Sequence, residues 1–208
     1  MKLALTCVTG LLLAGFASAQ EFSHFTADIG GGFTTPLGTT GSNLDYGWNI
    51  QGGVGYNFSP YFGTKVQAEF DDLGINSGTL HSLGYPGGDV HVFSATVDPI
   101  IHLTPRHPVD VYVIGGGGLY HFYQEFTQPT VVPVTVFDPF FGFYTAGFPG
   151  SQVLSSYSVN KPGWNGGLGV SFGAPHGHGR FFAEARYDHI FMSHSHVDYL
   201  PVSFGFRW

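Results

Sequence analysis

This 208-residue chain contains two short histidine motifs whose residue types and spacing suggest metal binding. His176 and His178 flank a glycine, and His194 and His196 flank a serine, so each pair would share one face of an extended strand. A protein metal site needs three or four ligands, and neither motif has a convergent carboxylate or thiol. We therefore expect no metal site and no other cofactor.

The segment Ser193-His194-Ser195-His196 also holds the residue types of an activated serine nucleophile. An imidazole base beside a hydroxyl can remove its proton and allow it to attack an acyl carbon. No orienting acid is evident, although Asp198 is near in the sequence. A hydrolase that uses Ser195 and His194 is therefore an alternative, although we expect a protein that is not an enzyme.

Charged residues form a third group, because several of them alternate with apolar or small residues. The set consists of Asp28, Lys65, Glu69, Asp71, Glu184, Arg186, Asp188 and Arg207. Alternate residues of a strand point to the same face, so a closed sheet would enclose these charges. Buried charges persist only when they are paired. We expect a static, structural network in which Lys65 and Arg186 form ion pairs with Glu69 and Glu184, with Asp188 nearby.

Composition limits the folds that could position these groups. The chain is 17% aromatic and only 10% charged, and it has 32 glycines, whereas an ordinary soluble domain has about 25% charged residues and about 7% glycine. Its formal net charge of −7 excludes a nucleic-acid binder, which needs a basic face. A mean hydropathy of +0.10 is too low for a bundle of membrane-spanning helices. These features favour a barrel whose strands alternate between lipid and interior.

Residues 1–19 have the pattern of a secretory signal peptide. Lys2 supplies the positive start, an apolar stretch follows, and Ala17 and Ala19 form a small-residue cleavage signal. The apolar stretch is shorter than the roughly 20 residues that a spanning helix requires. We therefore expect an exported domain that comprises residues 20–208.

Beyond the expected signal peptide, apolar and polar residues alternate with a period of two in a series of segments. The clearest are Tyr46–Phe58, Phe62–Phe70, Trp164–Phe172, Phe181–Tyr187 and Leu200–Trp208. The segment Phe25–Phe33 alternates in the same way, and Val90–Leu103 and Val109–Phe122 resemble strands with apolar residues on both faces, so their phase stays open. Pro99 lacks a ladder donor, and we expect a bulge there. The total is eight, an even number, as a closed antiparallel bacterial barrel requires.

Connection lengths support the same architecture, an all-β, up-and-down antiparallel transmembrane barrel. Short connections are expected after the second, fourth and sixth strands, at residues 59–61, 104–108 and 174–179. Long ones are expected after the others, at residues 34–45, 72–89, 123–163 and 189–198. Outer membrane barrels have short periplasmic turns and longer extracellular loops. Within the third long connection, residues 127–159 are expected to form a long extracellular loop, a projecting hairpin or a lid over the barrel mouth.

The final run Tyr199–Trp208 alternates apolar and polar residues and ends on an aromatic. It resembles the C-terminal signal of outer membrane barrels, and this resemblance implies that Phe204, Phe206 and Trp208 are recognised by the barrel-assembly machinery. With the other strands, the chain resembles the small eight-stranded OmpA/OmpX-like outer membrane β-barrel family over nearly its whole mature length. It departs from OmpA in ending at the barrel, without a peptidoglycan-binding domain. The Ser193–His196 segment only loosely resembles the His-x-Ser element of lipid A deacylases.

The resemblance implies an integral protein of the outer membrane of a Gram-negative-type bacterium, monomeric, in contact with outer membrane lipids and with extracellular loops. Eight strands enclose a lumen that side chains fill, so an open diffusion pore is not expected. We expect a non-enzymatic role in envelope structure or in surface contact and adhesion, with an unknown extracellular ligand. The alternatives are a narrow gated ion channel through the lumen and a lipid A-modifying hydrolase that uses Ser195 and His194.

Overall fold

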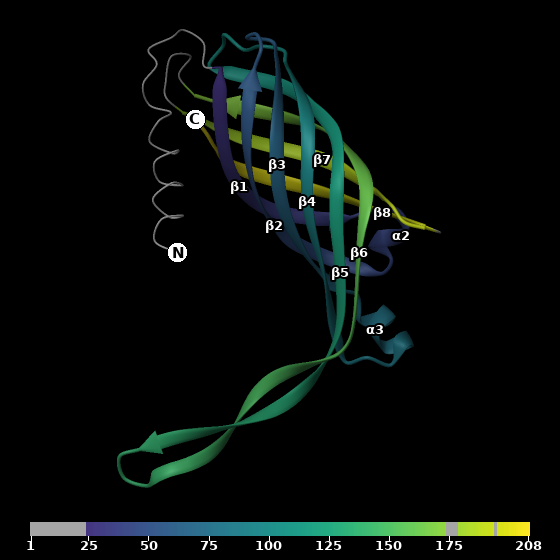
Figure 1. Ribbon diagram of the computed structural model, residues 1–208, viewed down its shortest axis with the longest axis vertical. Helices are drawn as coiled ribbons and strands as arrows, with labels where there is room; N and C mark the ends of the chain where they lie inside the picture. The colour runs from purple at the N-terminus through teal and green to yellow at the C-terminus, as the bar shows by residue number, and fades with distance from the viewer. Residues whose placement is uncertain (1–23, 174–178, 194) are drawn as a thin grey trace.

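Eight antiparallel strands form one closed sheet in this computed structural model, which describes residues 24–173, 179–193 and 195–208 (Figure 1). The strands are β1 (Phe25–Pro36), β2 (Leu44–Asn57), β3 (Phe62–Ile75), β4 (Gly87–His102), β5 (Val109–Asp138), β6 (Gly142–Phe172), β7 (Arg180–Phe191) and β8 (His196–Arg207). Each strand pairs with the next, and β8 pairs with β1. The prediction of an eight-stranded up-and-down barrel is confirmed.

Several sequence-based expectations fall outside the described residues. They are the signal peptide at residues 1–19 with its cleavage signal at Ala17 and Ala19, the turn with His176 and His178, and the side chain of His194. In the part of the chain that the structure describes, no helix is long and apolar enough to cross a membrane.

The two ends of the barrel differ in the elements that they carry. Both ends of the described sheet lie together, because Ala27 of β1 and Trp208 exchange backbone hydrogen bonds of 2.8 and 2.9 Å. The short β2–β3 connection lies at this end, which is at the top of Figure 1. The short helices α2 (Gly38–Gly41) and α3 (Ser77–Leu83) lie at the opposite end. The alternation of short and long connections therefore separates the two ends as expected.

Alternate side chains of every strand point to opposite faces of the barrel wall. On β2, Val54 is 63% exposed on the outer face, whereas Gln51 is buried inside. The structure also sets the phase of β4 and β5, whose even-numbered residues point inward, as the buried Asp98 and Tyr112 do. The outer face is apolar, and the inner face is mostly polar at mid-height.

The bulge expected at Pro99 is wrong. Pro99 pairs with Thr64 of β3 without any shift in register. On its other side, the β4–β5 ladder leaves out Asp98 and Pro99 and resumes at Ile100 in the same register. The missing donor of the proline is therefore accommodated by an interruption of the ladder and not by an extra residue.

Register shifts occur instead at two other places in the sheet. One lies between Leu44 and Gly47 on β2, and it turns the Leu44 side chain into the buried interior although its even number would place it outside. The other lies between Phe126 and Thr127 of β5, where the strand leaves the barrel. Such shifts bend a strand and change the direction of its side chains.

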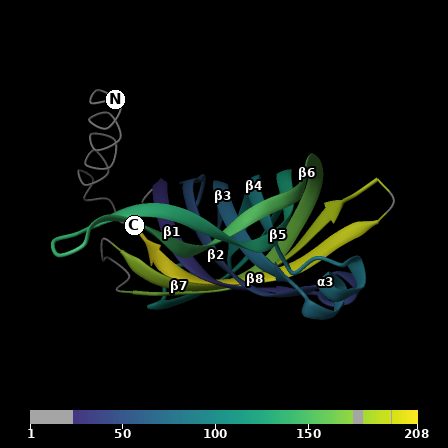
Figure 2. The same cartoon turned by 90° about the horizontal axis from the view of Figure 1, so that it is seen from below.

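Strands β5 and β6 continue together far beyond the barrel wall. The β4–β5 ladder ends at Thr127 and the β6–β7 ladder at Gly163, but the β5–β6 ladder continues to the pair Asp138–Gly142. Figures 1 and 2 show this extension as a long twisted ribbon that bends away to one side of the barrel. The structure therefore has residues 127–159 in a projecting hairpin and not in a lid over the barrel mouth.

Arginine substitutions on the outer face test the assignment of the two faces. Val54 and Leu168 are 63% and 62% exposed, and we expect them to contact lipid near mid-bilayer. Replacing either by Arg should lower the free energy of unfolding by about 2–4 kcal/mol, because a charge is costly there. Denaturant titration in lipid vesicles measures this change. Thr130→Arg on the projecting hairpin is the control, and equal stability of all three variants would contradict the assignment.

Candidate functional site

Arg186 of β7 forms the centre of a polar network inside the barrel. Its guanidinium donates to Glu184 Oε1 at 2.6 Å and to Asp98 Oδ2 at 3.1 Å. It also donates to the side-chain oxygen of Gln67 on β3. All four side chains are buried, so this arginine joins three strands across the lumen.

A second group of charges surrounds Asp28 of β1. Lys65 Nζ lies 3.2 Å from each carboxylate oxygen of Asp28, and Arg207 Nε lies 3.3 Å from Oδ2. Arg207 also approaches Glu184 Oε2 at 3.9 Å, which connects this group to the first. The Tyr112 hydroxyl donates to the same oxygen of Glu184 at 2.7 Å.

The pairing of Lys65 corrects one expectation from the sequence. Lys65 forms its ion pair with Asp28 and not with Glu69 or Glu184. Gly53 of β2 lies between these strands, and a Cβ atom there would come within 3.0 Å of Lys65 Cδ. The missing side chain therefore lets the lysine cross β2 and reach β1. The expected pairing of Arg186 with Glu184 is present at 2.6 Å.

Three lumen carboxylates accept hydrogen bonds only from neutral groups. Glu69 accepts from Gln67 at 2.9 Å, Asp71 accepts from the Thr34 hydroxyl at 2.5 Å, and Asp188 accepts from the Tyr120 hydroxyl at 2.6 Å. The second oxygen of each carboxylate is buried without a hydrogen-bond partner among the described residues. These acids are the least compensated charges of the network.

Carboxylates outnumber cations in the lumen. The buried acids are Asp28, Glu69, Asp71, Asp98, Asp110, Glu184 and Asp188, and the buried bases are Lys65, Arg186 and Arg207. Asp98 and Tyr112 were missed by the sequence analysis, because their strands have apolar residues on both faces. The polar residues Ser94, Thr96 and Asp98 alternate along β4 and are all buried. This alternation could have predicted which face of β4 points into the lumen.

Apolar side chains fill parts of the lumen beside the charged network. One cluster lies toward the end that carries α2 and α3, and it contains Leu44, Leu73, Ile75, Val90, Val92, Tyr120, Phe122, Ile190 and Tyr199. A smaller cluster of Ile100, Tyr112 and Ile114 lies against the network itself, because the Tyr112 hydroxyl donates to Glu184. Side chains therefore fill the interior of this eight-stranded barrel, as such a narrow lumen permits.

Two histidines and an aspartate form a group on the outer face, near the connection between β7 and β8. His189 Nδ1 is 2.6 Å from Asp198 Oδ1, and His196 Nε2 is 3.3 Å from Asp198 Oδ2. No orienting acid is evident in the sequence, although Asp198 is near the serine–histidine segment, and the structure brings Asp198 to these two histidines. Ser193 accepts a hydrogen bond from Lys161 Nζ at 2.7 Å. Among the described residues, no three His, Cys, Asp or Glu side chains form a group that could hold a metal ion.

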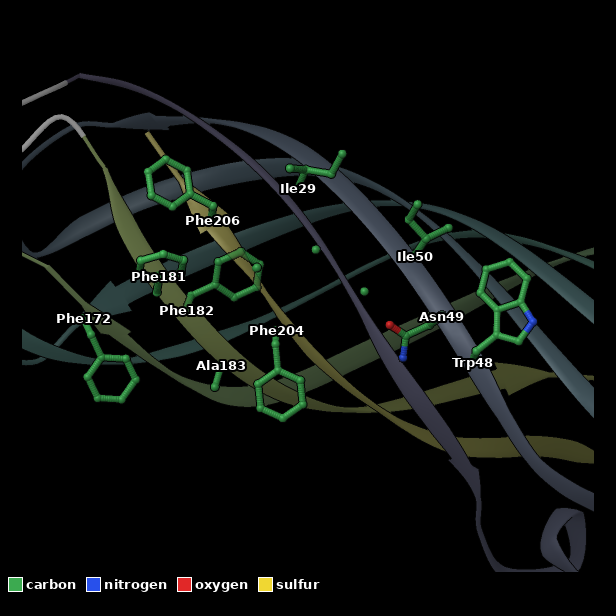
Figure 3. A pocket seen from close by; sticks show the side chains of 13 residues that line it. Ile29, Trp48, Asn49, Ile50, Phe172, Phe181, Phe182, Ala183, Phe204 and Phe206 are labelled. Carbon is green, nitrogen blue, oxygen red and sulfur yellow. The ribbon is translucent and has the colours of Figure 1, made fainter.

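An apolar groove crosses the outer face at the β1–β8 seam (Figure 3). Ile29 and Ile50 lie along one side, and Phe181, Phe204 and Phe206 lie along the other. Gly31 of β1 pairs with Phe204 and carries no side chain, so no side chain fills the groove at this position on the outer face. The lining suits hydrocarbon chains and offers few polar groups to a soluble ligand.

Two substitutions in the lumen test whether carboxylates that are paired with a cation affect stability differently from carboxylates without one. Arg186→Leu leaves Asp98 buried without its cation and leaves Glu184 with only the more distant Arg207, and we expect it to cost about 3–5 kcal/mol of folding free energy. Asp71→Asn removes one excess negative charge and keeps an acceptor for Thr34, so it should leave stability unchanged or raise it. Denaturant titration in vesicles measures the free energy of unfolding of both variants. If Asp71→Asn lowered this free energy as much as Arg186→Leu does, the result would contradict this description.

Known proteins share both the sequence pattern and the fold of this chain. The family model described as outer membrane protein beta-barrel domain matches residues 4–206. No curated protein matches the chain. The chain is similar to the crystal structure of Neisserial surface protein A, with 16% identity, a TM-score of 0.57, and coverage of 89% of this chain and 96% of that one.

Two further solved structures resemble the chain. A major outer membrane protein from Thermus thermophilus is 11% identical with a TM-score of 0.53, over 88% of this chain and 97% of that one. Ail, the attachment invasion locus protein of Yersinia pestis, is 18% identical with a TM-score of 0.48, over 89% of this chain and 100% of that one. The family model spans nearly the whole sequence, so this chain belongs to the outer membrane protein beta-barrel domain family and is an integral protein of the outer membrane.

Proposed function

We propose that this protein is a non-enzymatic, monomeric outer membrane barrel that makes surface contacts through its projecting β5–β6 hairpin. The observation that carries the proposal is the ribbon itself, which extends beyond the barrel wall at the end opposite Ala27 and Trp208 (Figure 1). In outer membrane barrels this side is extracellular. The hairpin is therefore placed to meet an extracellular partner.

The filled lumen supports a role on the outside of the barrel. Arg186 and its partners cross the lumen, and two apolar clusters fill space beside them. This arrangement argues against transport through the barrel. It also leaves the gated ion channel without a specific observation in its favour.

The described histidines near the β7–β8 connection contact an acid and not a serine. A serine hydrolase needs a hydrogen-bonded nucleophile and base. The described contacts of His189 and His196 lead to Asp198, and the described contact of Ser193 leads to Lys161. These contacts involve neither Ser195 nor His194, and His194 lies outside the described residues, so the hydrolase alternative has no observation in its favour.

Assembly and export complete the proposal. We infer that residues 1–19 are removed on export and that Phe204, Phe206 and Trp208 are recognised by the barrel-assembly machinery. Phe204 and Phe206 lie on the outer face of the last strand. Outer membrane lipids contact this face, including the groove at the β1–β8 seam (Figure 3).

Deletion of the hairpin tests the contact function. Residues 128–152 would be replaced by an Asn-Gly turn, which favours a tight hairpin at the barrel rim. We expect the shortened protein to keep its heat-modifiable gel migration and its place in the outer membrane, but cells that produce it should lose adherence to other cells and surfaces. A variant with residues 77–83 of α3 replaced by a short turn is the matched control. Unchanged adherence after hairpin deletion would contradict the proposal, and increased detergent sensitivity would indicate a role in envelope structure.

Conductance measurements test the filled lumen. In planar lipid bilayers we expect the intact protein to give no stable current steps, because charged and apolar side chains fill the interior. Arg186→Leu provides a comparison in which the central ion pairs are lost. Stable steps from the intact protein would favour the channel.

A further inference from the structure

The tip of the hairpin carries a concentration of exposed aromatic side chains. Phe140 and Phe141 in the turn are 90% and 85% exposed, and Phe143 is 77% exposed. Phe137 pairs with Phe143 across the ribbon, with ring centroids 5.1 Å apart. Clusters of this kind on a protein surface mark a site of interaction.

The local backbone holds this tip in a tight turn. The Asp138 carboxylate accepts the backbone N–H groups of Phe140 and Phe141 at 2.7 and 3.1 Å. Gly142 closes the turn with a φ of 77°, which other residues rarely adopt. Both aromatic rings of the turn are therefore directed outward by a fixed backbone conformation.

The hairpin is almost free of charge. Asp138 is the one charged residue between Glu125 and Lys161, and its carboxylate is already used in the turn. A polyanion or an acidic lipid surface would require basic residues, which this stretch lacks. The chemistry of the tip therefore fits an uncharged or zwitterionic surface.

Both faces of the ribbon are apolar near the tip. Phe137 and Phe143 lie on one face, and Tyr144 and Phe148 lie on the other, all of them exposed. A protein partner docked on one face would leave the other face in water. A medium that surrounds the tip, such as the interfacial region of a lipid bilayer, covers both faces at once.

Prolines oppose the addition of a further strand to the ribbon. Pro129 and Pro133 lie on the open edge of β5, and Pro149 lies on the open edge of β6. A proline within a paired ribbon has no N–H to offer to an added strand. Edge pairing with a partner strand is therefore disfavoured on both sides, which leaves the aromatic tip as the contact surface.

We propose that the aromatic tip, Phe137–Tyr144, inserts into the interfacial region of an apposed, zwitterionic lipid bilayer. This inference rests on the proposed contact function and names its partner as lipid. The reach agrees with such a contact, because Thr127 to Asp138 spans roughly 35 Å beyond the last pairing with β4. Phe140 and Phe141 enter first, and the uncharged stem stays in water with its backbone hydrated.

Flotation of the full chain with vesicles tests the proposal. The protein, embedded in lipid nanodiscs, would be mixed with vesicles of phosphatidylcholine and centrifuged in a density gradient, with empty nanodiscs as the background. We expect co-flotation that changes little between low and high salt. The double variant Phe140→Ser/Phe141→Ser should reduce binding by about tenfold or more, because each phenylalanine loses its transfer from water.

A matched variant separates the tip from general apolar surface. Val153→Ser/Tyr157→Ser also removes two exposed apolar side chains, but at the base of the hairpin, and should bind vesicles like the unaltered chain. Heat-modifiable migration shows that each variant is folded. Absence of vesicle binding, equal binding by the tip variant, or a requirement for acidic lipid would overturn the proposal.

A fluorescent label distinguishes the apposed bilayer from the protein's own membrane. The single cysteine, Cys7, lies in the expected signal peptide, so Phe143→Cys in the processed chain provides one labelling site, with Ser151→Cys as the control. Nitroxide lipids in the vesicles should quench the label at the tip, whereas nitroxide lipids in the nanodisc should not. Quenching from the nanodisc would overturn the proposal. Loss of cell adherence on hairpin deletion without any vesicle binding would retain the contact function and refute lipid as its partner.

Discussion

The pairing of β1 with β8 is the interaction on which the rest of this structure depends. It closes the sheet from Asp28–Arg207 to Pro36–Tyr199 and leaves no open edge in the wall. In lipid, every unpaired backbone group costs several kcal/mol, so only a closed ladder permits strands to cross a bilayer. Closure also creates a narrow interior in which each inward side chain must fit and be paired.

The contents of the lumen follow from that closure. Arg186 reaches Asp98 because a barrel of eight strands brings β4 and β7 within the length of one side chain, whereas Glu184 is its neighbour on the same face of β7. The same narrowness leaves Glu69 and Asp71 near other acids, with neutral donors as partners. At the end of the barrel opposite the β2–β3 connection, strands β5 and β6 continue beyond the wall as the projecting hairpin (Figure 1).

The sequence predicted the wall well because alternation is a local property. Val54 and Gln51 occupy opposite faces as their spacing indicates, and eight such segments predict closure. Contacts across the lumen were harder to predict, since they depend on the relative height of distant strands. Lys65 reaches Asp28 because Gly53 lies between them, and this requires the register of three strands.

Where both faces are apolar, alternation gives no phase, so Asp98 was missed. The hairpin shows the same limit, because Phe140 and Phe141 could as readily have packed over the mouth as a lid. A register shift beside Thr127 and prolonged pairing of β5 with β6 decide its direction, and neither is visible in a single sequence. Pro99 shows that an unusual residue can be accommodated by an interrupted ladder without a change in register.

Nuclear magnetic resonance of the protein in lipid nanodiscs tests the closed wall most directly. The account predicts cross-strand contacts between Ile29 and Phe206 and between Gly30 and Gly205, with amides of β1 and β8 that exchange with solvent as slowly as those of β3. Rapid exchange along β1 and β8 without these contacts would show two open edges and would contradict the closed barrel.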